Sequence, residues 1–520
     1  MVPVLTASEM RDADRRTIEE VGLPGPVLME NAGAAIAAAI VKRFPSARRM
    51  VVLCGKGNNG GDGFVAARRL LDRRPTVFLL GRRSEVKGDA RVHLGAYERS
   101  GGTLTEVADA DAWSGVRERV LAADLIVDAM LGTGLQNAPA GVIGRAIEDL
   151  ATSAPLAPIL AVDLPSGLAS DTGEVAWETV RATCTIAFAA PKRGHVLPPA
   201  CDRVGELEIV DIGIPPGALV PASPLYLLEP RDAAAAFPQR APSAHKGDFG
   251  HVLVIAGSVG KTGAAVLCAA GALRAGAGLV TVATPTPALG LLVAAVRPEA
   301  MTEPLPLTEG GALGKDAIDR ALALAESRDA VVIGPGLGQG AEVRAFVREL
   351  LSRCERPMVV DADGLNAASS AKGGPSPLRR TAATLVTPHP GEMARLIGST
   401  TAEVQRRRVE TARAFAVETG AVTVLKGQRT IVTDADGRAA VNATGNPGMA
   451  TGGTGDVLAG ILGALIARGV PAWDTAVAGV FLHGRAGDLA AARLGQEAML
   501  AGDLIDAIPD AIRSVRQGAS

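Results

Sequence analysis

The residues best suited to chemistry lie in a glycine-rich stretch at 445–456, GNPGMATGGTGD, which runs directly into VLAGILGALIARG. The apolar residues after it recur with helical spacing, so the stretch predicts a glycine loop that opens a helix. Free N–H groups and the positive end of the helix dipole favour an anion there, most often phosphate. Asp456 falls in the first helical turn, where its carboxylate could accept a proton from a hydroxyl group beside that phosphate. The alternative is a glycine turn in which Asp456 only starts the helix.

A second glycine-rich loop, GKGNNGGDG at 55–63, follows the apolar run RMVVLC. Its glycines fit the dinucleotide fingerprint GxGxxG, so a dehydrogenase is the first interpretation. Asn58, Asn59 and Asp62 argue against an ordinary dinucleotide turn, because small residues usually pack at these positions. They indicate a loop that itself binds a ligand.

Three further apolar runs in the first half of the chain end in polar residues. Asp128 and a glycine loop at 132–134 follow one run, Asp163 and Ser166 follow the next, and Lys192 follows another. In open parallel sheets ligands bind outside the carboxyl ends of strands, so these side chains can converge on one crevice. The alternative for each is a loop-capping Asp or Ser, or a solvated Lys.

The second half of the chain carries comparable motifs. Lys426 beside Gly427 can contact phosphate oxygens, and His389 follows a predicted strand between two prolines, although neutral histidines commonly cap turns. A Walker A motif is excluded, because Ile255 occupies the position five residues before Gly260 where a glycine is required. Four segments follow predicted strands: GPGLG at 334–338, DADGLN at 361–366, TPHPGE at 387–392 and LKGQRT at 425–430.

To bring these motifs to one edge of a sheet, strands and helices must alternate along the chain. The sequence has this pattern, since apolar strand-like runs alternate with stretches of helical spacing. Uninterrupted apolar runs indicate parallel strands covered on both faces. A hairpin with a turn at Asp436-Gly437 is expected near 430–441. A cluster of prolines at 215–245 marks a boundary, so the sequence predicts two tandem α/β domains. The predicted strands are 50–54, 77–80, 125–129, 159–162 and 184–189 before that boundary, and 251–256, 279–283, 330–333, 358–360, 384–386 and 422–425 after it.

Composition narrows the class of protein. A length of 520 residues allows two to four domains at roughly 150 residues each. A net charge of −2 and only 3% aromatic residues provide neither the basic surface nor the stacking side chains that nucleic-acid binding needs.

The apolar run at 262–283 contains Arg274 and several glycines, so it predicts a helix and a strand rather than a membrane span. The five cysteines lack CxxC spacing and indicate buried thiols. Early charged residues argue against a signal peptide. We therefore expect a cytoplasmic protein, and a homo-oligomer, that binds neither nucleic acid nor membrane.

Together the motifs resemble a known family. GKGNNGGDG, DAMLGTGL and VDLPSG look like the N-terminal epimerase domain of NAD(P)H-hydrate repair enzymes. The motifs of the second half, with GMATGGTGDVLAG, resemble the ribokinase-like dehydratase branch. The resemblance implies a Rossmann-like three-layer α/β/α epimerase domain at 1–218, a proline-rich linker at 219–244 and a ribokinase-like dehydratase domain at 245–520.

The family repairs nicotinamide cofactors to which water has been added, leaving a hydroxyl on C6 in R and S forms. The resemblance implies that the first domain interconverts the epimers of NADHX and NADPHX. The second would dehydrate the S form with ADP and Mg2+, releasing AMP and phosphate. Two alternatives are an ATP-dependent small-molecule kinase of the ribokinase superfamily and a non-catalytic nucleotide sensor.

The resemblance also assigns residues. In the dehydratase, Asp456 activates the hydroxyl group, and the loop at 452–455, including Gly455, holds the transferred phosphoryl group. The nucleotide is assigned to Lys426, Gly427, Gln428, Arg429 and Thr430, and the remaining cofactor contacts to Ala264, Gly336 and His389. In the epimerase, Asp163 and Lys192 are catalytic. The epimerase residues that bind the cofactor are Asn58, Asn59, Gly60, Gly61, Asp62, Gly132, Thr133, Gly134, Leu135, Gln136, Asn137, Ala138 and Asp163.

A monovalent cation is expected in the epimerase domain. Asn59, Asp128 and Ser166 all offer oxygen ligands, which suit a hard cation. A single carboxylate balances one positive charge, whereas a divalent ion usually recruits more carboxylates. The resemblance places K+ at these three residues.

Overall fold

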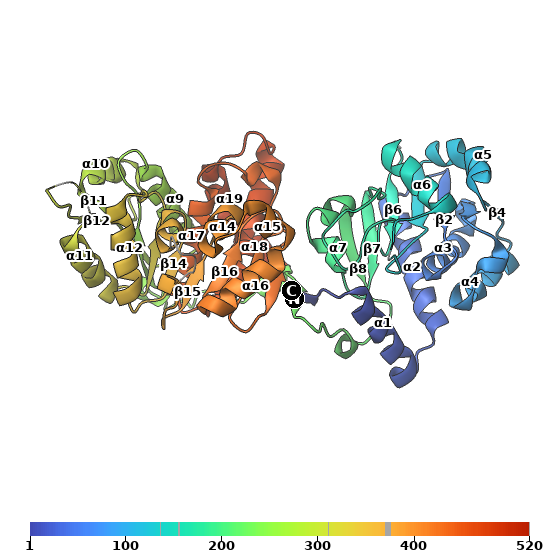
Figure 1. The fold of residues 1–520 in the computed structure, drawn as a ribbon, viewed down its shortest axis with the longest axis horizontal. Helices are drawn as coiled ribbons and strands as arrows, with labels where there is room; N and C mark the ends of the chain where they lie inside the picture. Colours follow the sequence, from blue (N-terminus) through green and yellow to red (C-terminus); the bar gives the residue numbers. More distant parts are fainter. Residues whose placement is uncertain (136, 154–155, 310, 312, 370–375, 519–520) are drawn as a thin grey trace. The chain divides into compact units, whose positions relative to one another are not determined.

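The computed structural model describes residues 1–135, 137–153, 156–309, 311, 313–369 and 376–518. The chain forms two compact units, Val2–Leu225 and Tyr226–Ser520, the second of which also includes Met1 (Figure 1).

The first unit is built on a seven-stranded sheet with the order β4-β3-β2-β5-β6-β7-β8. Every neighbouring pair is parallel. All carboxyl ends therefore meet at one edge of the sheet, where the polar motifs follow. The strands of this sheet are β2 Met50–Cys54, β3 Thr76–Leu79, β4 Leu104–Glu106, β5 Leu125–Ala129, β6 Ile159–Val162, β7 Cys184–Phe188 and β8 Glu206–Val210, and the short strand β1 Val2–Pro3 lies outside it.

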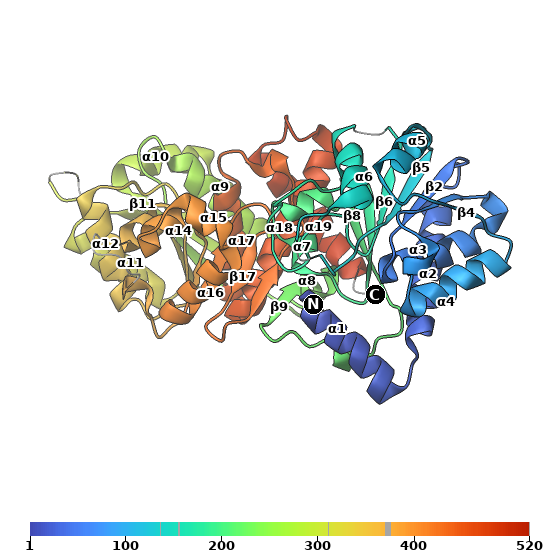
Figure 2. The same ribbon diagram turned by 45° about the vertical axis from the view of Figure 1, so that its right-hand side comes forward.

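Helices cover both faces of this sheet (Figure 2). Alternate residues of β2 face opposite ways: Val52 packs with helices α2, α3 and α4, whereas Leu53 packs with the core beneath α5 and α6. This alternation follows from the two-residue period of a strand and produces three layers. The helices are α1 Ala7–Arg16, α2 Gly25–Arg43, α3 Asn58–Arg69, α4 Gly88–Arg99, α5 Ala110–Leu121, α6 Gly141–Thr152 and α7 Arg193–Val196.

The second unit contains a larger sheet with the order β9-β18-β17-β16-β15-β14-β13-β10-β11-β12. The strands from β16 to β12 are parallel, while β17 pairs antiparallel with both β16 and β18. The strands are β9 Leu225–Leu227, β10 His251–Ile255, β11 Leu279–Pro285, β12 Met301–Leu305, β13 Ala330–Ile333, β14 Met358–Val360, β15 Thr384–Val386, β16 Val422–Leu425, β17 Ile431–Thr433 and β18 Ala439–Val441.

The apolar helix α17 lies against this sheet and against α9, so its residues are almost all buried. This packing fixes the glycine-rich N-terminus of α17 at the carboxyl edge of the strands. The helices are α8 Pro230–Ala234, α9 Thr262–Arg274, α10 Thr286–Ala295, α11 Lys315–Glu326, α12 Ala341–Arg353, α13 Asp363–Ala368, α14 Pro390–Ile397, α15 Thr401–Arg406, α16 Arg408–Thr419, α17 Thr454–Ala467, α18 Ala472–Leu494 and α19 Ala501–Gln517.

The fold class predicted from sequence is confirmed: two tandem α/β units with parallel sheets. Every strand expected from an apolar run is present, as is the hairpin, whose Gly437 has φ +79°. The sequence did not predict the short strands β1 and β9, nor did it predict β4, β8 and β12. The last three strands lie at sheet edges, where charged residues interrupt the apolar run.

The segment at 219–244, expected as a linker, carries β9 and α8. Leu228, Ala233 and Phe237 from this segment join the buried core of the second unit. Its chain is therefore held by apolar packing in spite of its prolines.

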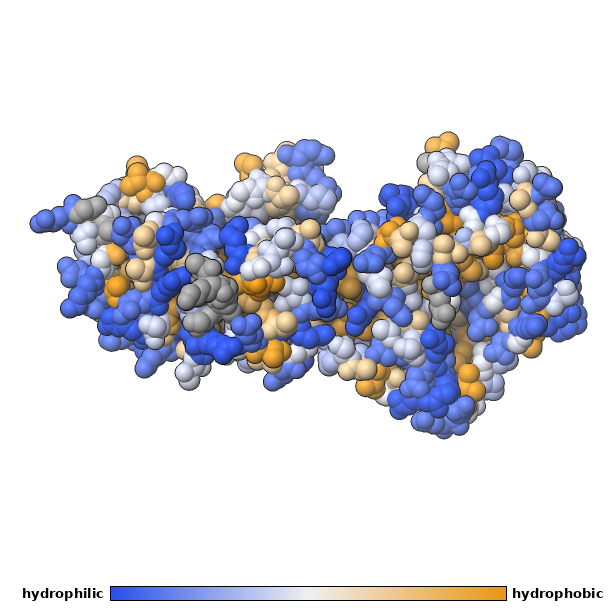
Figure 3. All heavy atoms as spheres, viewed as in Figure 1, coloured by the Kyte–Doolittle hydropathy of each residue, from blue (hydrophilic) through white to orange (hydrophobic). Residues whose placement is uncertain are grey.

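All five cysteine thiols are buried, as predicted, and within the described residues none of them forms a disulfide. The face seen in Figure 3 is mostly hydrophilic, with apolar residues in small scattered groups. Among the helices described, none combines the length and the hydrophobicity needed to cross a bilayer.

Candidate active sites

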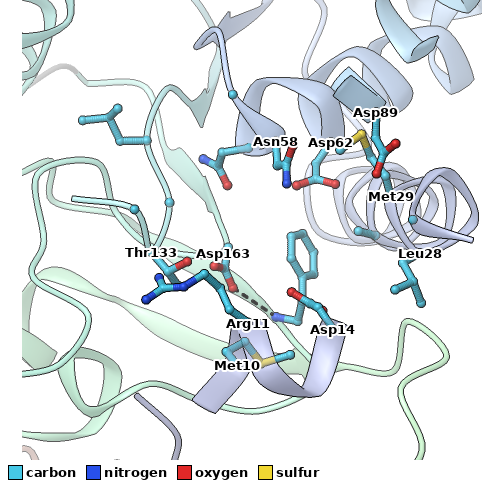
Figure 4. A pocket seen from close by; sticks show the side chains of 18 of the residues that line it. Met10, Arg11, Asp14, Leu28, Met29, Asn58, Asp62, Asp89, Thr133 and Asp163 are labelled. Carbon is cyan, nitrogen blue, oxygen red and sulfur yellow. Dashed lines mark hydrogen bonds between the residues drawn. The ribbon is translucent and has the colours of Figure 1, made fainter. Parts of the chain in front are cut away.

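A pocket of about 570 Å3 opens at the carboxyl edge of the first sheet (Figure 4). The loop after β2 forms part of its wall and leads directly into α3. This turn requires glycine, since a Cβ atom on Gly60 would lie 1.9 Å from the carbonyl oxygen of Gly55. The close approach places Asn58, Asn59 and Asp62 at the pocket.

Asp163 and Lys192 form a buried ion pair in this pocket. Lys192 Nζ donates to Asp163 Oδ1 at 2.6 Å, and the lysine side chain is only 1% exposed. Asp163 has φ +60°, an unfavourable conformation for a residue with a Cβ atom. The backbone N–H of Lys192 donates to His195 Nδ1, so the Nε2–H of His195 is free to donate to the Asp163 carbonyl at 2.6 Å. Burial lowers the pKa of His195 to about 4, which keeps the ring neutral.

Asp128 and Ser166 lie together beneath the pocket. Ser166 donates its Oγ–H to Asp128 Oδ1 at 2.5 Å and its backbone N–H to Oδ2 at 2.8 Å. The Leu131 carbonyl oxygen lies 3.3 Å from Ser166 Oγ. Burial raises the pKa of Asp128 to about 6. Asn59 is also buried, and its Nδ2 has no hydrogen-bond partner among the described residues.

The structure brings most of the predicted epimerase residues to one place. The predicted residues lining the pocket are Asn58, Asn59, Asp62, Gly132, Thr133, Gly134, Leu135, Asp163 and Lys192. Of the described residues, Gly60, Gly61, Asn137 and Ala138 do not line it, and Ala138 instead borders a separate hollow beside Trp177. Gln136 lies outside the described residues.

Sequence motifs did not reveal that α1 also lines this pocket. Met10, Arg11 and Asp14 project into it from α1 (Figure 4). This helix lies well before the first glycine loop in the sequence and carries no recognisable motif. Only the tertiary fold brings its residues to the pocket.

In the second unit, the glycine loop leads into α17 as predicted. Gly453 occupies the N-cap position with φ +96°, a conformation that suits glycine, and Asp456 lies in the first turn. Burial raises the pKa of Asp456 to about 7, with the negative charge of Asp361 adding to the effect. His483 Nε2 lies 2.8 Å from the Thr454 carbonyl oxygen at the start of the same helix.

Beside this helix, Lys426 lies in a cluster of acidic side chains. Its Nζ donates to Asp361 Oδ1 at 2.7 Å and lies 3.9 Å from Glu392 Oε2. Burial works against the charged ammonium, but these two carboxylates outweigh it, so the pKa of Lys426 is raised. A Cβ atom on Gly455 would lie 3.4 Å from Lys426 Nζ, which places the lysine next to the glycine loop.

His389 caps helix α14. Its Nδ1 accepts the backbone N–H groups of Gly391 and Glu392 at 3.0 and 3.3 Å, and the Glu392 carboxylate in turn accepts the backbone N–H of His389. Burial lowers the pKa of His389, and the positive charge of Lys426 adds to that effect. His389 therefore has the turn-capping role that is common for neutral histidines.

The other predicted residues of the second unit lie in two loops. Gly336 has φ +65°, and a Cβ atom there would lie 3.0 Å from Ala264 Cβ, so these two residues adjoin. Between β16 and β17, Gly427 and Arg429 have φ +129° and +55°, and Thr430 Oγ donates to the Gly427 carbonyl at 3.0 Å. The remaining predicted residue of this tight turn is Gln428.

Comparison with known proteins defines the class. Residues 25–194 match the family described as YjeF-related protein N-terminus, and residues 252–510 match the family described as NAD(P)H-hydrate dehydratase. The chain is thus a two-domain α/β enzyme with a Rossmann-like first unit and a ribokinase-like second unit.

Relatives match the chain along nearly its whole length. The bifunctional NAD(P)H-hydrate repair enzyme of Moorella thermoacetica is 44% identical over 99% of this chain and 97% of the relative. The Escherichia coli K12 enzyme of the same name is 38% identical over 96% and 92%. The chain belongs to the family of bifunctional NAD(P)H-hydrate repair enzymes.

Among solved structures, the ADP/ATP-dependent NAD(P)H-hydrate dehydratase from Bacillus subtilis, co-crystallised with ATP/Mg2+, is similar to this chain. It is 32% identical, and the match covers 56% of this chain and 98% of that one with a TM-score of 0.49.

Proposed function

We propose that this protein repairs hydrated nicotinamide cofactors. The first unit interconverts the R and S hydrates of NADH and NADPH, and the second dehydrates the S form with ADP, releasing AMP and phosphate. The observation that carries this proposal is the placement of Asp456, whose partly buried carboxylate lies in the first turn of a helix that opens with a glycine loop. A base and an anion-binding helix end are thereby brought to the same point.

The dehydratase chemistry follows from that geometry. Hydroxide is a poor leaving group, so the C6 hydroxyl must first become a phosphate ester. Asp456 accepts the hydroxyl proton while the N-terminus of α17, including Gly455, holds the transferred phosphoryl group. Electrons from the ring nitrogen then expel phosphate from C6, and loss of a proton from C5 to water re-forms the C5=C6 double bond of the dihydronicotinamide.

We assign the nucleotide to the loop of Lys426, Gly427, Gln428, Arg429 and Thr430, and the hydrated cofactor to Ala264, Gly336 and His389. The carboxylates of Asp361 and Glu392 lie beside this loop and offer the oxygen ligands that Mg2+ prefers. When bound with ADP, Mg2+ would neutralise phosphate charge.

In the first unit, we assign the substrate to the pocket. The loop residues Asn58, Asn59, Asp62 and Thr133 surround it, and the Asp163–Lys192 pair fixes a charged group on its wall. The neutral His195 holds the Asp163 backbone and thereby keeps the pair in place.

We also propose that K+ binds at Asn59, Asp128 and Ser166. Oxygens of Asp128 and Leu131 already lie within 3.3 Å of the Ser166 hydroxyl. A Cβ atom on Gly132 would lie 3.2 Å from Asn59 Oδ1, so the amide oxygen of Asn59 adjoins the loop that follows Leu131. Such oxygen donors suit a hard cation of single charge.

Removing the Asp128 carboxylate tests the K+ site. Asp128→Ala should weaken epimerisation and abolish its dependence on added K+, while ADP-dependent dehydration of the pure S epimer stays unchanged. Epimerisation is followed by chromatographic separation of the R and S hydrates in K+ or choline buffer. An Asp128→Ala variant that epimerises normally would remove the cation from this site.

The overall function is tested by the absorbance of NADH at 340 nm. A mixture of R and S hydrates should be converted completely to NADH when ADP is added, with equal amounts of AMP and free phosphate. A simple kinase would instead accumulate a stable phosphorylated product, and a sensor would leave the absorbance unchanged.

The buried reduced thiols support a cytoplasmic location, and we expect a homo-oligomer. Light scattering of the purified chain measures the oligomeric state directly.

A further inference from the structure

Asp14 and Asp62 are two of the four aspartates that, among the described residues, line the pocket of the first unit. Asp14 approaches from α1 and Asp62 from α3 (Figure 4). Asp62 is 7% exposed and Asp14 is partly buried. Within the described residues, neither carboxylate accepts a hydrogen bond or forms an ion pair.

Two of the three described cationic residues that line the pocket, Lys192 and Lys56, already form ion pairs. Lys192 is bound to Asp163 at 2.6 Å, and Lys56 at the pocket rim is paired with Glu85. The other charged groups that line the pocket are Arg11 and Asp89. Asp62 lies near the carboxylates of Asp163 and Asp14. In addition to burial, these two charges raise the pKa of Asp62, whereas the charge of the paired Lys192 lowers it.

We propose that Asp14 and Asp62 are the acid–base pair of the epimerase pocket, acting on the C6 hydroxyl and the ring nitrogen of NAD(P)H hydrate. This inference rests on the function proposed for the first unit. When two buried carboxyl groups repel one another, their pKa values separate, so one group stays protonated while the other ionises. One pocket then contains an acid and a base together.

The substrate chemistry calls for such a pair. C6 of the hydrate carries both a hydroxyl group and the ring nitrogen N1, so it is a carbinolamine. The base removes the hydroxyl proton, the C6–N1 bond breaks with its electrons passing to N1, and the acid gives N1 a proton. The open form has an aldehyde at C6. Rotation about C5–C6 and attack of N1 on the other face, with both proton transfers reversed, gives the other epimer. No oxidant, reductant or net proton is consumed.

The surroundings of the two carboxyl groups assign their roles. Burial raises the pKa of Asp62 well above its ordinary value, and neighbouring carboxylates raise it further. Burial raises the pKa of Asp14 to about 6. The stronger upward shift assigns the protonated role to Asp62, the acid in ring opening, and the ionised role to Asp14, the base.

The test uses the full chain and purified R hydrate of NADPH, without ADP, and follows formation of the S hydrate above the uncatalysed rate. Asp14→Asn and Asp62→Asn should each lower kcat for epimerisation at least ~10²-fold. The matched control is Asp12→Asn, which changes an exposed aspartate of the same helix α1 that does not line the pocket and should stay within about threefold of wild type, below the range of general acid–base effects. ADP-dependent dehydration of the S hydrate by each variant reports whether the chain is folded. Should Asp62→Asn fail to fold, the more exposed Asp14 decides the question.

The pH profile provides a second readout. For wild type, kcat/KM of epimerisation should rise with pH through about 6 as Asp14 ionises, and Asp14→Asn should lack this rise. An Asp14→Asn variant that epimerises within about threefold of wild type, below the range of general-base effects, or keeps the rise, overturns the acid–base pair alone. A wild-type chain that dehydrates but does not epimerise overturns the function proposed for the first unit as well.

Discussion

At the scale of single residues, Asp456 has the surroundings of a base suited to neutral pH. Burial and Asp361 raise its pKa to about 7, and Lys426 opposes them. A base whose pKa lies near the working pH is partly ionised at that pH and still binds a proton strongly enough to accept it from a hydroxyl group. In the proposed mechanism, the acidic cluster around Lys426 acts by setting the protonation of Asp456.

Asp456→Asn preserves the shape of the side chain but removes the base. ADP-dependent dehydration should fall at least ~10²-fold, the lower end of general-base effects, while ADP affinity measured by calorimetry changes little. In wild type, kcat/KM should rise with pH through about 7, since Asp456 must lose its proton to act. Retained turnover in the variant would favour another base.

A second prediction concerns stability. Lys192→Met leaves the Asp163 carboxylate without its counter-charge, and breaking a buried ion pair costs about 3–5 kcal/mol. The matched control is Lys56→Met, which breaks the Lys56–Glu85 pair, whose side chains are each 43% exposed, and should cost less than about 1 kcal/mol. Urea unfolding measures both. Equal losses for the two variants would contradict a special role for the buried pair.

At the scale of elements, the turn from β2 into α3 depends on one close approach. A Cβ atom on Gly60 would lie 1.9 Å from the Gly55 carbonyl oxygen, whereas a Cβ atom on Gly57 would meet nothing within 4 Å among the described residues. The turn therefore has room for a side chain at Gly57 but not at Gly60.

Gly60→Ala should destabilise the first unit by about 1–3 kcal/mol, as overpacking does, and lower epimerisation. Gly57→Ala should cost less than about 1 kcal/mol, because only a modest N-cap preference is lost. Thermal unfolding with epimerisation assays distinguishes them. If both alanine variants behave alike, the close approach does not control the turn.

The same turn illustrates which features follow from local sequence and which do not. Glycines and strand-end polar residues fall on contiguous motifs, so the amino-acid order alone places 55–63, Asp163 and Lys192 at one edge of a sheet. The Lys426–Asp361 contact joins residues 65 positions apart, and Asp14 reaches the pocket from a helix without a motif. Such contacts depend on how elements pack, and local pattern carries no record of that packing.

At the scale of the whole molecule, the chain divides after Leu225, and the first unit is built on a seven-stranded sheet to which only its own strands contribute. A fragment comprising residues 1–225 should fold and epimerise hydrates with no nucleotide present. Circular dichroism and the epimerisation assay check both points. A fragment that epimerises only with ADP would show that the two activities are not divided as proposed.

The buried cysteines give this molecule a built-in chemical reporter. Cys54, Cys184 and Cys201 lie in the first unit, and Cys268 and Cys354 in the second. Burial raises the pKa of Cys184 to about 11 and that of Cys268 well above its usual value, so reactive thiolate is scarce in the folded state. Alkylating reagents and peroxide should thus spare the native enzyme. Maleimide mass tagging during mild denaturation would then read out the opening of each unit separately, from three tags on one and two on the other.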